Sequence, residues 1–121
     1  MGKPTLLIGA SPKKERYANK AMHMLMEHGH EVYPYHPKYR EVDGQRVYND
    51  FADVPGPVDT VTVYVRPDIL EGLLPEISAL DPGRVIFNPG TESPALQRAL
   101  EAKGIETLQA CTLVLLTTKQ F

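Results

Sequence analysis

Three short and nearly continuous apolar runs constrain the fold of this chain most. They are TLLIG at residues 5–9, TVTVYV at 60–65 and RVIFN at 84–88. Strands that read as unbroken apolar runs are typical of parallel sheets covered on both faces. Two further runs, EVYPY at 31–35 and IETLQA at 105–110, bring the set to five. Since helical patterns separate most of them, the sequence predicts a Rossmann-like, doubly wound α/β domain with a mostly parallel five-stranded sheet.

Helices are expected between and after these runs. An apolar face within residues 18–26 predicts a first helix that ends at Gly29. Residues 67–80 carry a second helical pattern, in which Pro75 predicts a kink or a break. The clearest pattern covers 93–104, and 112–118 predicts a short last helix.

The segment 38–58 between the second and third runs is rich in turn residues. It predicts a small strand at Val47–Tyr48 and a short helical turn near Asp50–Asp53.

Composition sets the class of protein. The chain has 121 residues, a net charge of −2 and a single cysteine, Cys111. This length suits one domain over residues 1–121, and the charge gives no electrostatic reason to expect nucleic acid or a membrane surface as partner. We see no signal peptide, and one cysteine allows no internal disulfide, so we expect a cytoplasmic protein. A protein partner and the oligomeric state are left open.

Ligands of doubly wound domains bind in the crevice at the carboxyl ends of the strands. This rule selects the five segments that follow the five predicted strands. They are Gly9–Ser11, Tyr35–Lys38, Val65–Pro67, Asn88–Thr91 and Ala110–Thr112.

The segment after the first strand has one glycine where a dinucleotide fingerprint has three. Gly9 permits a tight turn, and the amides before the following helix, with the Ser11 hydroxyl, could bind an anion. The second and third glycines are missing, and Ser11 and Pro12 make the approach to a phosphate different from that of a dinucleotide site. Three basic residues follow, Lys13, Lys14 and Arg16. An ordinary strand-to-helix turn with solvated cations explains the segment equally well.

The segment after the second strand lacks the acidic residue with which NAD sites hold the ribose hydroxyls. It carries His36, Pro37 and Lys38 instead. The basic residues could meet a phosphate, and the fixed proline ring could pack against a flat base. This favours a ligand with a phosphorylated ribose over NAD, while an exposed surface loop is the alternative.

The remaining segments are less specific. Arg66 could bind phosphate or pair with Asp68, and Asn88–Gly90 could contact the polar end of a ligand or form only a turn. Cys111 precedes the last predicted helix, where a thiol can be reactive, although buried and inert cysteines are more common. We find no catalytic triad, paired carboxylates, P-loop or metal-ligand spacing, so the case for an enzyme is thin.

Taken together, these segments resemble the small single-domain CoA-binding proteins of the YccU-like family. The fold of that family is related to the CoA-binding domain of succinyl-CoA synthetase alpha subunits. The matching pieces are the GAS turn at 9–11, the P-x-x-P pattern at 34–37, the ADVP lead-in at 52–55 and the cysteine after the fifth strand. The chain differs from the usual family pattern at FNPGTE, residues 87–92, and at Thr112.

The resemblance implies a role for each segment. Gly9, Ala10 and Ser11, with basic residues such as Arg16 behind them, would face the CoA diphosphate. Pro37 and Lys38 would border the adenine and the ribose phosphate, and His36 beside them is a further candidate for binding the cofactor. The opposite wall of the crevice and the path of the pantetheine arm would be formed by Val65, Arg66, Pro67, Asn88, Gly90 and Cys111.

The sequence therefore favours a small cytoplasmic protein that binds CoA or acyl-CoA and has no evident catalytic machinery. One alternative is an NADP-binding redox sensor or oxidoreductase fragment, because no acid follows the second strand. Another is a thiol switch in which Cys111 forms a mixed disulfide with CoA.

Overall fold

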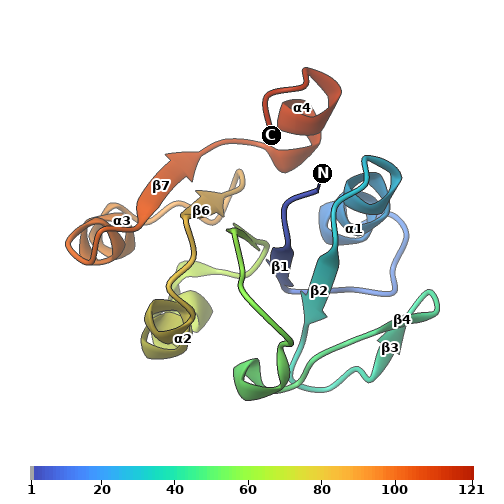
Figure 1. Ribbon diagram of the computed structural model, residues 1–121, viewed down its shortest axis with the longest axis horizontal. Coiled ribbons are helices and arrows are strands. Elements are labelled where there is room, and N and C mark those ends of the chain that lie inside the picture. The colour runs from blue at the N-terminus through green and yellow to red at the C-terminus, as the bar shows by residue number, and fades with distance from the viewer. Residues whose placement is uncertain (1) are drawn as a thin grey trace.

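The computed structural model describes residues 2–121, which form one domain around a five-stranded and fully parallel sheet (Figure 1). The strands lie in the order β2-β1-β5-β6-β7. Their bounds are β1 Thr5–Ile8, β2 Val32–Tyr35, β5 Thr60–Val63, β6 Arg84–Phe87 and β7 Glu106–Gln109. The predicted doubly wound α/β architecture is confirmed.

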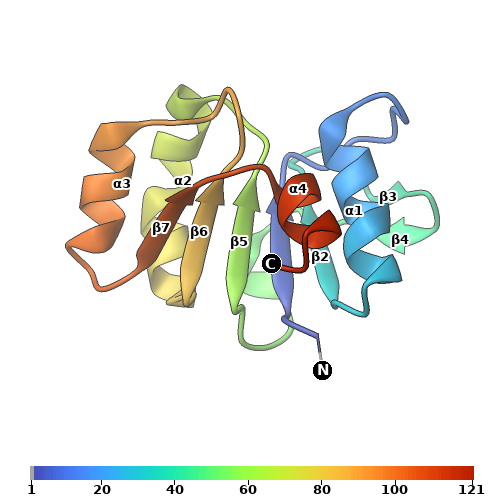
Figure 2. The same cartoon turned by 90° about the horizontal axis from the view of Figure 1, so that it is seen from above.

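Helices cover both faces of the sheet (Figure 2). On one face lie α1 (Tyr17–Glu27) and α4 (Thr112–Thr117), and on the other lie α2 (Pro67–Leu80) and α3 (Pro94–Glu101). Within residues 2–121, no helix is both long and apolar enough to cross a membrane.

The apolar runs form strands because both of their faces are buried. Leu6 and Ile8 pack into the core layer beneath α2 and α3, whereas Leu7 packs beneath α1 and α4. All three side chains are fully buried. Because successive side chains of a strand point to opposite faces of the sheet, one strand contributes to two separate hydrophobic cores. Each core lies on one face of the sheet.

The segment between β2 and β5 differs from its prediction. A two-stranded antiparallel hairpin, β3 (Glu41–Val42) and β4 (Gln45–Arg46), replaces the expected strand at Val47–Tyr48. Tyr48 makes only one isolated bridge, to Tyr35. Asp43 and Gly44 form the hairpin turn with positive φ angles of 49° and 81°, a conformation that Asp-Gly pairs favour. The helical turn is present as a 3-10 helix, η1, at Phe51–Asp53.

Some helices and strands end earlier in the structure than the sequence patterns predicted. β5 ends at Val63, so Tyr64 and Val65 lie in the loop beyond the strand. α2 runs through Pro75 without a break, so of the kink or break that Pro75 predicted, the break is absent. α3 begins as expected, with the Ser93 hydroxyl accepting the Leu96 amide at 3.3 Å, but it ends at Glu101 rather than 104.

Candidate functional site

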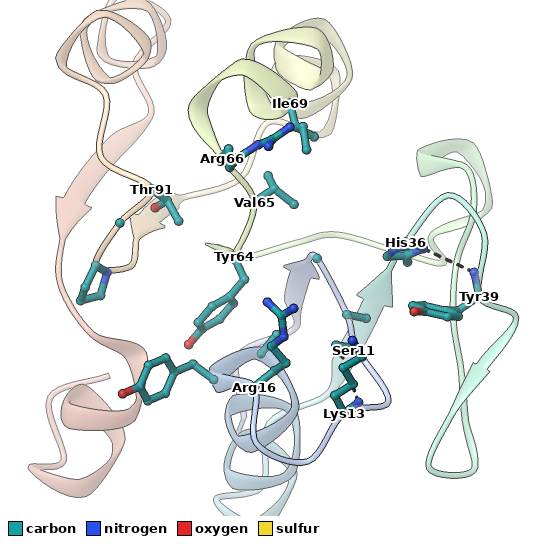
Figure 3. Close-up of a pocket in the computed structure, with 16 residues that line it drawn as sticks. Ser11, Lys13, Arg16, His36, Tyr39, Tyr64, Val65, Arg66, Ile69 and Thr91 are labelled. Carbon is teal, nitrogen blue, oxygen red and sulfur yellow. Dashed lines mark hydrogen bonds between the residues drawn. The ribbon is translucent and has the colours of Figure 1, made fainter.

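A cavity of about 500 Å³ opens at the carboxyl ends of β1, β2, β5 and β6. Its lining residues come from four segments, within 9–18, 36–39, 64–69 and 89–91 (Figure 3). Its volume lies within the usual range of small-molecule sites, roughly 300–1,000 Å³. The strand order places the four segments around one crevice, as the sequence predicted for ligands of this fold.

Gly9 sets the shape of the cavity floor. Its φ is +102°, and a Cβ at this position would lie 2.9 Å from the Tyr64 carbonyl oxygen. Only glycine therefore lets the loop after β1 approach the loop after β5 this closely.

The backbone amides of this loop are partly engaged within the protein. Gly9 and Ala10 both donate to the Tyr35 carbonyl at 3.0 Å, and the Lys13 amide donates to the Ser11 hydroxyl oxygen at 3.2 Å. The amides of Gly9 and Ala10 are thus already engaged within the protein. The Ser11 hydroxyl keeps its own hydrogen to donate.

Asn19, which the sequence analysis did not select, holds the Ser11 segment from behind. Its side chain is 3% exposed and donates to the Ser11 carbonyl at 2.9 Å and to the Asp43 carboxylate at 3.0 Å. Asp43 also lies 2.7 Å from His23 Nε2. These contacts join the loop after β1, helix α1 and the β3–β4 hairpin into one support.

The charged groups that line the cavity are all basic. Lys13, Arg16 and Arg66 contribute cations, and no Asp or Glu is among the lining residues that the structure describes. Arg66 also pairs with Asp68 at 3.4 Å, but both side chains are largely exposed, so this pair is weak. In a chain with a net charge of −2, the cationic lining makes the cavity suitable for a polyanion.

A rigid turn forms one wall. His36 Nδ1 accepts the Lys38 amide at 3.0 Å and the Tyr39 amide at 3.4 Å. From outside, Asn49 Nδ2 donates to the carbonyls of His36 at 2.8 Å and Tyr39 at 2.7 Å. Burial, followed by the positive charge of Lys38, lowers the pKa of His36 below its ordinary value of 6.5.

Beneath the cavity lies a buried polar layer. The Asn88 amide is 1% exposed and donates to Thr62 Oγ1 at 2.7 Å and to the Val63 carbonyl at 2.9 Å. Its oxygen accepts the Thr112 amide at 2.8 Å. Asn88 therefore ties the ends of β5 and β6 to the start of α4, and its side chain supports the site from below.

Tyr64 inserts its ring between the cavity and this layer. Burial raises the pKa of Tyr64 to about 12, and its hydroxyl lies beside Thr62 and Thr112. Those two hydroxyls bond to each other at 2.8 Å, and the Tyr64 hydroxyl is buried without a hydrogen-bond partner within residues 2–121.

The sequence-predicted site residues divide into two groups. Eight line the cavity, namely Gly9, Ala10, Ser11, Arg16, His36, Val65, Arg66 and Gly90. Five do not, namely Pro37, Lys38, Pro67, Asn88 and Cys111. Of these five, Pro37 and Lys38 lie in the 36–39 turn, Pro67 is the first residue of α2, and the half-buried Cys111 is the residue before α4.

Sequence reasoning missed an apolar rim. Four large hydrophobic side chains are exposed in residues 2–121, and three of them, Tyr17, Tyr39 and Ile69, line the cavity. Ile69 belongs to the apolar pattern of its helix, but its side chain is exposed whereas Leu70 and Ile77 are buried. The sequence pattern alone does not distinguish Ile69 from the buried apolar residues. Figure 3 shows Ile69 and Arg66 at the start of α2, across the cavity from Ser11 and Lys13.

Fold and site together define a Rossmann-like domain whose crevice suits a phosphorylated ligand. A family described as a CoA binding domain matches residues 3–117, and the chain belongs to this family. The uncharacterized protein YneT of Bacillus subtilis is 24% identical over 98 residues, which cover 81% of this chain and 73% of YneT.

Solved structures agree with this assignment. A crystal structure of an uncharacterized protein has a TM-score of 0.94 and 43% identity, and the match covers 100% of this chain and 99% of that one. Acetyl-coenzyme A synthetase 1 of Ca. Korarchaeum cryptofilum has a TM-score of 0.75 and 20% identity over 90% of this chain and 26% of the synthetase. At that identity the synthetase shares the fold alone.

Proposed function

We propose that this protein binds CoA or acyl-CoA in the cavity at the carboxyl ends of the strands and catalyses no reaction on it. The observation that carries the proposal is the lining, in which Lys13, Arg16 and Arg66 surround a concave space that no described acidic residue shares. Family membership favours CoA among phosphorylated ligands. The diphosphate of CoA is permanently ionised at neutral pH, so it matches fixed guanidinium donors.

Each wall then has a role in this proposal. Ser11 and Arg16 hold the diphosphate, and Arg66 with Val65 forms the opposite wall. The adenine and its ribose lie toward His36 and Tyr39.

The pantetheine arm leaves past Gly90 toward the start of α4, where Cys111 lies. In this arrangement Asn88 shapes the exit without touching the ligand, because its amide is fully engaged inside the protein.

Lys38 stands outside the lining but within the turn that borders the ribose. We infer that its flexible side chain reaches the 3′-phosphate from the rim. Lys38→Ala should then weaken binding of CoA and leave binding of 3′-dephospho-CoA unchanged. Equal affinity of the unaltered protein for the two ligands would remove this assignment.

The test is isothermal titration of the purified protein with CoA, NADP and NAD in parallel, after a check for co-purified nucleotide. We expect micromolar binding of CoA alone. Arg16→Ala should weaken it by about tenfold or more, since charge-assisted hydrogen bonds contribute roughly 1.5–3 kcal/mol. Lys103→Ala is the matched control, because it removes an exposed cation beyond the end of α3, outside the cavity lining.

Three results would contradict the proposal. Preferential binding of NADP would favour a redox role. Loss of CoA binding in Lys103→Ala as large as in Arg16→Ala would mean that net charge, not the cavity, attracts the ligand. If a folded and ligand-free sample bound none of the three nucleotides, the crevice would not be a nucleotide-binding site and the proposal would be wrong.

A further inference from the structure

His36 has an unusual position among the basic groups of the cavity, because one of its ring nitrogens is already used by the backbone. Nδ1 accepts the amides of Lys38 and Tyr39, at 3.0 and 3.4 Å. A nitrogen that accepts N–H groups in the ring plane carries no proton. In the neutral ring the single proton must therefore be on Nε2.

Nε2 is left free to donate. It makes no hydrogen bond within residues 2–121, and the ring lines the cavity. Figure 3 shows the contact between His36 and the Tyr39 backbone nitrogen as a dashed line. Because Nδ1 makes this contact, Nε2 lies on the opposite side of the imidazole ring. The ring is also fixed against Tyr39, with centroids 4.2 Å apart and an interplanar angle of 35°.

The turn that carries His36 is held from three directions. Besides the two bonds to Nδ1, Asn49 binds the carbonyls of His36 and Tyr39, and the His36 amide donates to the Tyr48 carbonyl at 3.1 Å. The imidazole therefore has little freedom to rotate and exchange its two nitrogens. A ligand meets a donor whose direction is set before binding.

A second proton on this ring would oppose the turn. It would place an N–H at Nδ1 directly against the two backbone N–H groups that now donate to it. The other charged groups lining the cavity are Lys13, Arg16 and Arg66, and Lys38 belongs to the same turn, so the lining and the turn add only positive charge near the ring. Burial and Lys38 lower the pKa of His36, which agrees with this geometry.

We propose that His36 acts as a neutral hydrogen-bond donor, through Nε2, to an oxygen of the bound ligand, and that positive charge on this ring weakens binding. The inference rests on the proposed function, since it assigns a contact within the same site. It reverses the usual expectation for a histidine beside a phosphorylated ligand, where protonation adds charge attraction and strengthens binding. Whether ligand affinity falls or rises at acidic pH therefore distinguishes a neutral hydrogen-bond donor from a positively charged histidine.

The ligand for the test is 3′-dephospho-CoA. A phosphate monoester has a second pKa of about 6, so the 3′-phosphate of CoA would itself lose charge over the range of interest. The diphosphate of 3′-dephospho-CoA stays ionised. We expect its affinity for the unaltered protein to fall by about threefold or more between pH 7.5 and pH 5, as the free protein takes up a proton at His36. Stronger binding at pH 5 would overturn the proposal.

Three variants at this position sharpen the test. His36→Asn keeps an oxygen that can accept the amide two residues on and a nitrogen that can donate, so it should bind within about threefold of the unaltered protein and lose the acid dependence. His36→Phe keeps the ring contact with Tyr39 but neither polar atom, and should bind about tenfold or more weakly. His36→Lys supplies charge without the turn bonds, and should not restore binding. Tighter binding by His36→Lys than by His36→Asn would contradict the neutral role.

The ring state is measured without any ligand by long-range ¹H–¹⁵N correlation NMR on the free protein. We expect an unprotonated Nδ1 and a protonated Nε2 at pH 7, and the opposite tautomer would overturn the inference even if His36→Phe failed to fold. If CoA binds but the pH dependence has the opposite sign, this inference fails and the proposed function stands. If the tautomer is as expected but neither CoA nor its dephospho form binds, the proposed function fails, and the donor role fails with it.

Discussion

Cations gather at both ends of the sheet, but their surroundings differ. At the amino end, Arg84 Nε donates to Thr60 Oγ1 at 2.8 Å, and its guanidinium lies 4.5 Å from the centre of the Phe121 ring. Lys3 Nζ donates to the Phe121 carbonyl at 2.9 Å, and the Lys3 amide donates to His30 Nδ1 at the same distance. Burial lowers the pKa of Arg84, which marks a charge held within the structure.

At the carboxyl end, the cations have almost no internal partners. Neither Lys13 nor Arg16 forms an ion pair within residues 2–121, and Arg66 has only its exposed contact with Asp68. All three line the cavity.

The comparison teaches that charge alone does not identify a binding site. Cations that are engaged with neighbouring groups contribute to folding, and cations that border a concave space without partners are available to a ligand. At the carboxyl end, stabilising the fold and binding a ligand fall to residues at different depths. The buried polar layer around Asn88 stabilises the fold, and the cations that line the cavity above it have almost no partners among the residues that the structure describes. Substitutions at each depth and at each end should therefore change different quantities.

Asn88→Ala should give the largest effect. It removes three hydrogen bonds and leaves the Thr112 amide and the Val63 carbonyl buried without this partner. We expect the free energy of unfolding to fall by about 3 kcal/mol, measured by chemical denaturation, because an unpaired buried polar group costs roughly 1–3 kcal/mol. Ser93→Ala, which removes a partly exposed helix cap nearby, is the control and should cost about 1 kcal/mol. A smaller loss for Asn88→Ala than for the control would mean that the buried layer does not carry stability.

The next effect concerns alkaline pH. The pKa of Tyr64 is raised to about 12, so above pH 10 the unfolded chain ionises at this residue while the folded protein does not. Stability is therefore fully present below pH 10 and should fall by about 2–3 kcal/mol as the pH rises to 12. Tyr64→Phe should remove this residue's share of the slope and should be neutral or stabilising at pH 7, since the lost hydroxyl has no partner. An unchanged alkaline slope in Tyr64→Phe would place the cause at another tyrosine or lysine.

A matched pair of arginine substitutions tests the comparison between the two ends directly. Arg84→Ala should lower the free energy of unfolding by about 1–2 kcal/mol, through the lost Thr60 bond and Phe121 contact, and leave CoA affinity unchanged. Arg66→Ala should do the reverse, with about tenfold weaker CoA binding and a stability change within about 0.5 kcal/mol. Denaturation and calorimetric titration of both variants give the four values. Equal effects of the two substitutions on either quantity would break the distinction between engaged and free cations.

The general fold could be predicted from the sequence because its signals are local and repeated. The nearly continuous apolar runs at 5–9, 60–65 and 84–88 indicate strands that are buried on both faces, as strands of a covered parallel sheet are. The β3–β4 hairpin was missed although Asp43–Gly44 is a typical hairpin pair, because its strands have two residues each and carry no alternation to detect.

The candidate site could be predicted only as a set of strand ends. The rule for doubly wound sheets selected the loops at Gly9, His36 and Arg66, which the cavity does bring together. The rule cannot tell which side chain at a strand end faces the ligand. The Asn88 side chain points inward and donates to the Val63 carbonyl of β5, and Asn19 of α1 donates to Ser11 and Asp43. Both roles depend on contacts between residues far apart in the chain, which a local sequence pattern does not contain.

The smallest expected effect lies at the support behind the loop after β1. The hydrogen bonds from His23 and Asn19 lower the pKa of Asp43 below its ordinary value. A carboxylate with a depressed pKa stabilises the fold above about pH 4, and this contribution is lost as the pH falls through the folded-state pKa. Asp43→Asn should reduce the acid slope of the unfolding midpoint between pH 5 and pH 2, and asparagine tolerates the positive φ at this position.

CoA affinity should stay within about twofold in Asp43→Asn, because Asn19 keeps its bond to the Ser11 carbonyl and an exposed pair such as His23–Asp43 contributes little. Asn19→Ala is the contrast, since it removes the bond to Ser11 itself and should weaken CoA binding more than Asp43→Asn does. If Asp43→Asn weakened binding as much as Asn19→Ala, the hairpin would belong to the binding machinery of the carboxyl end and not to its support.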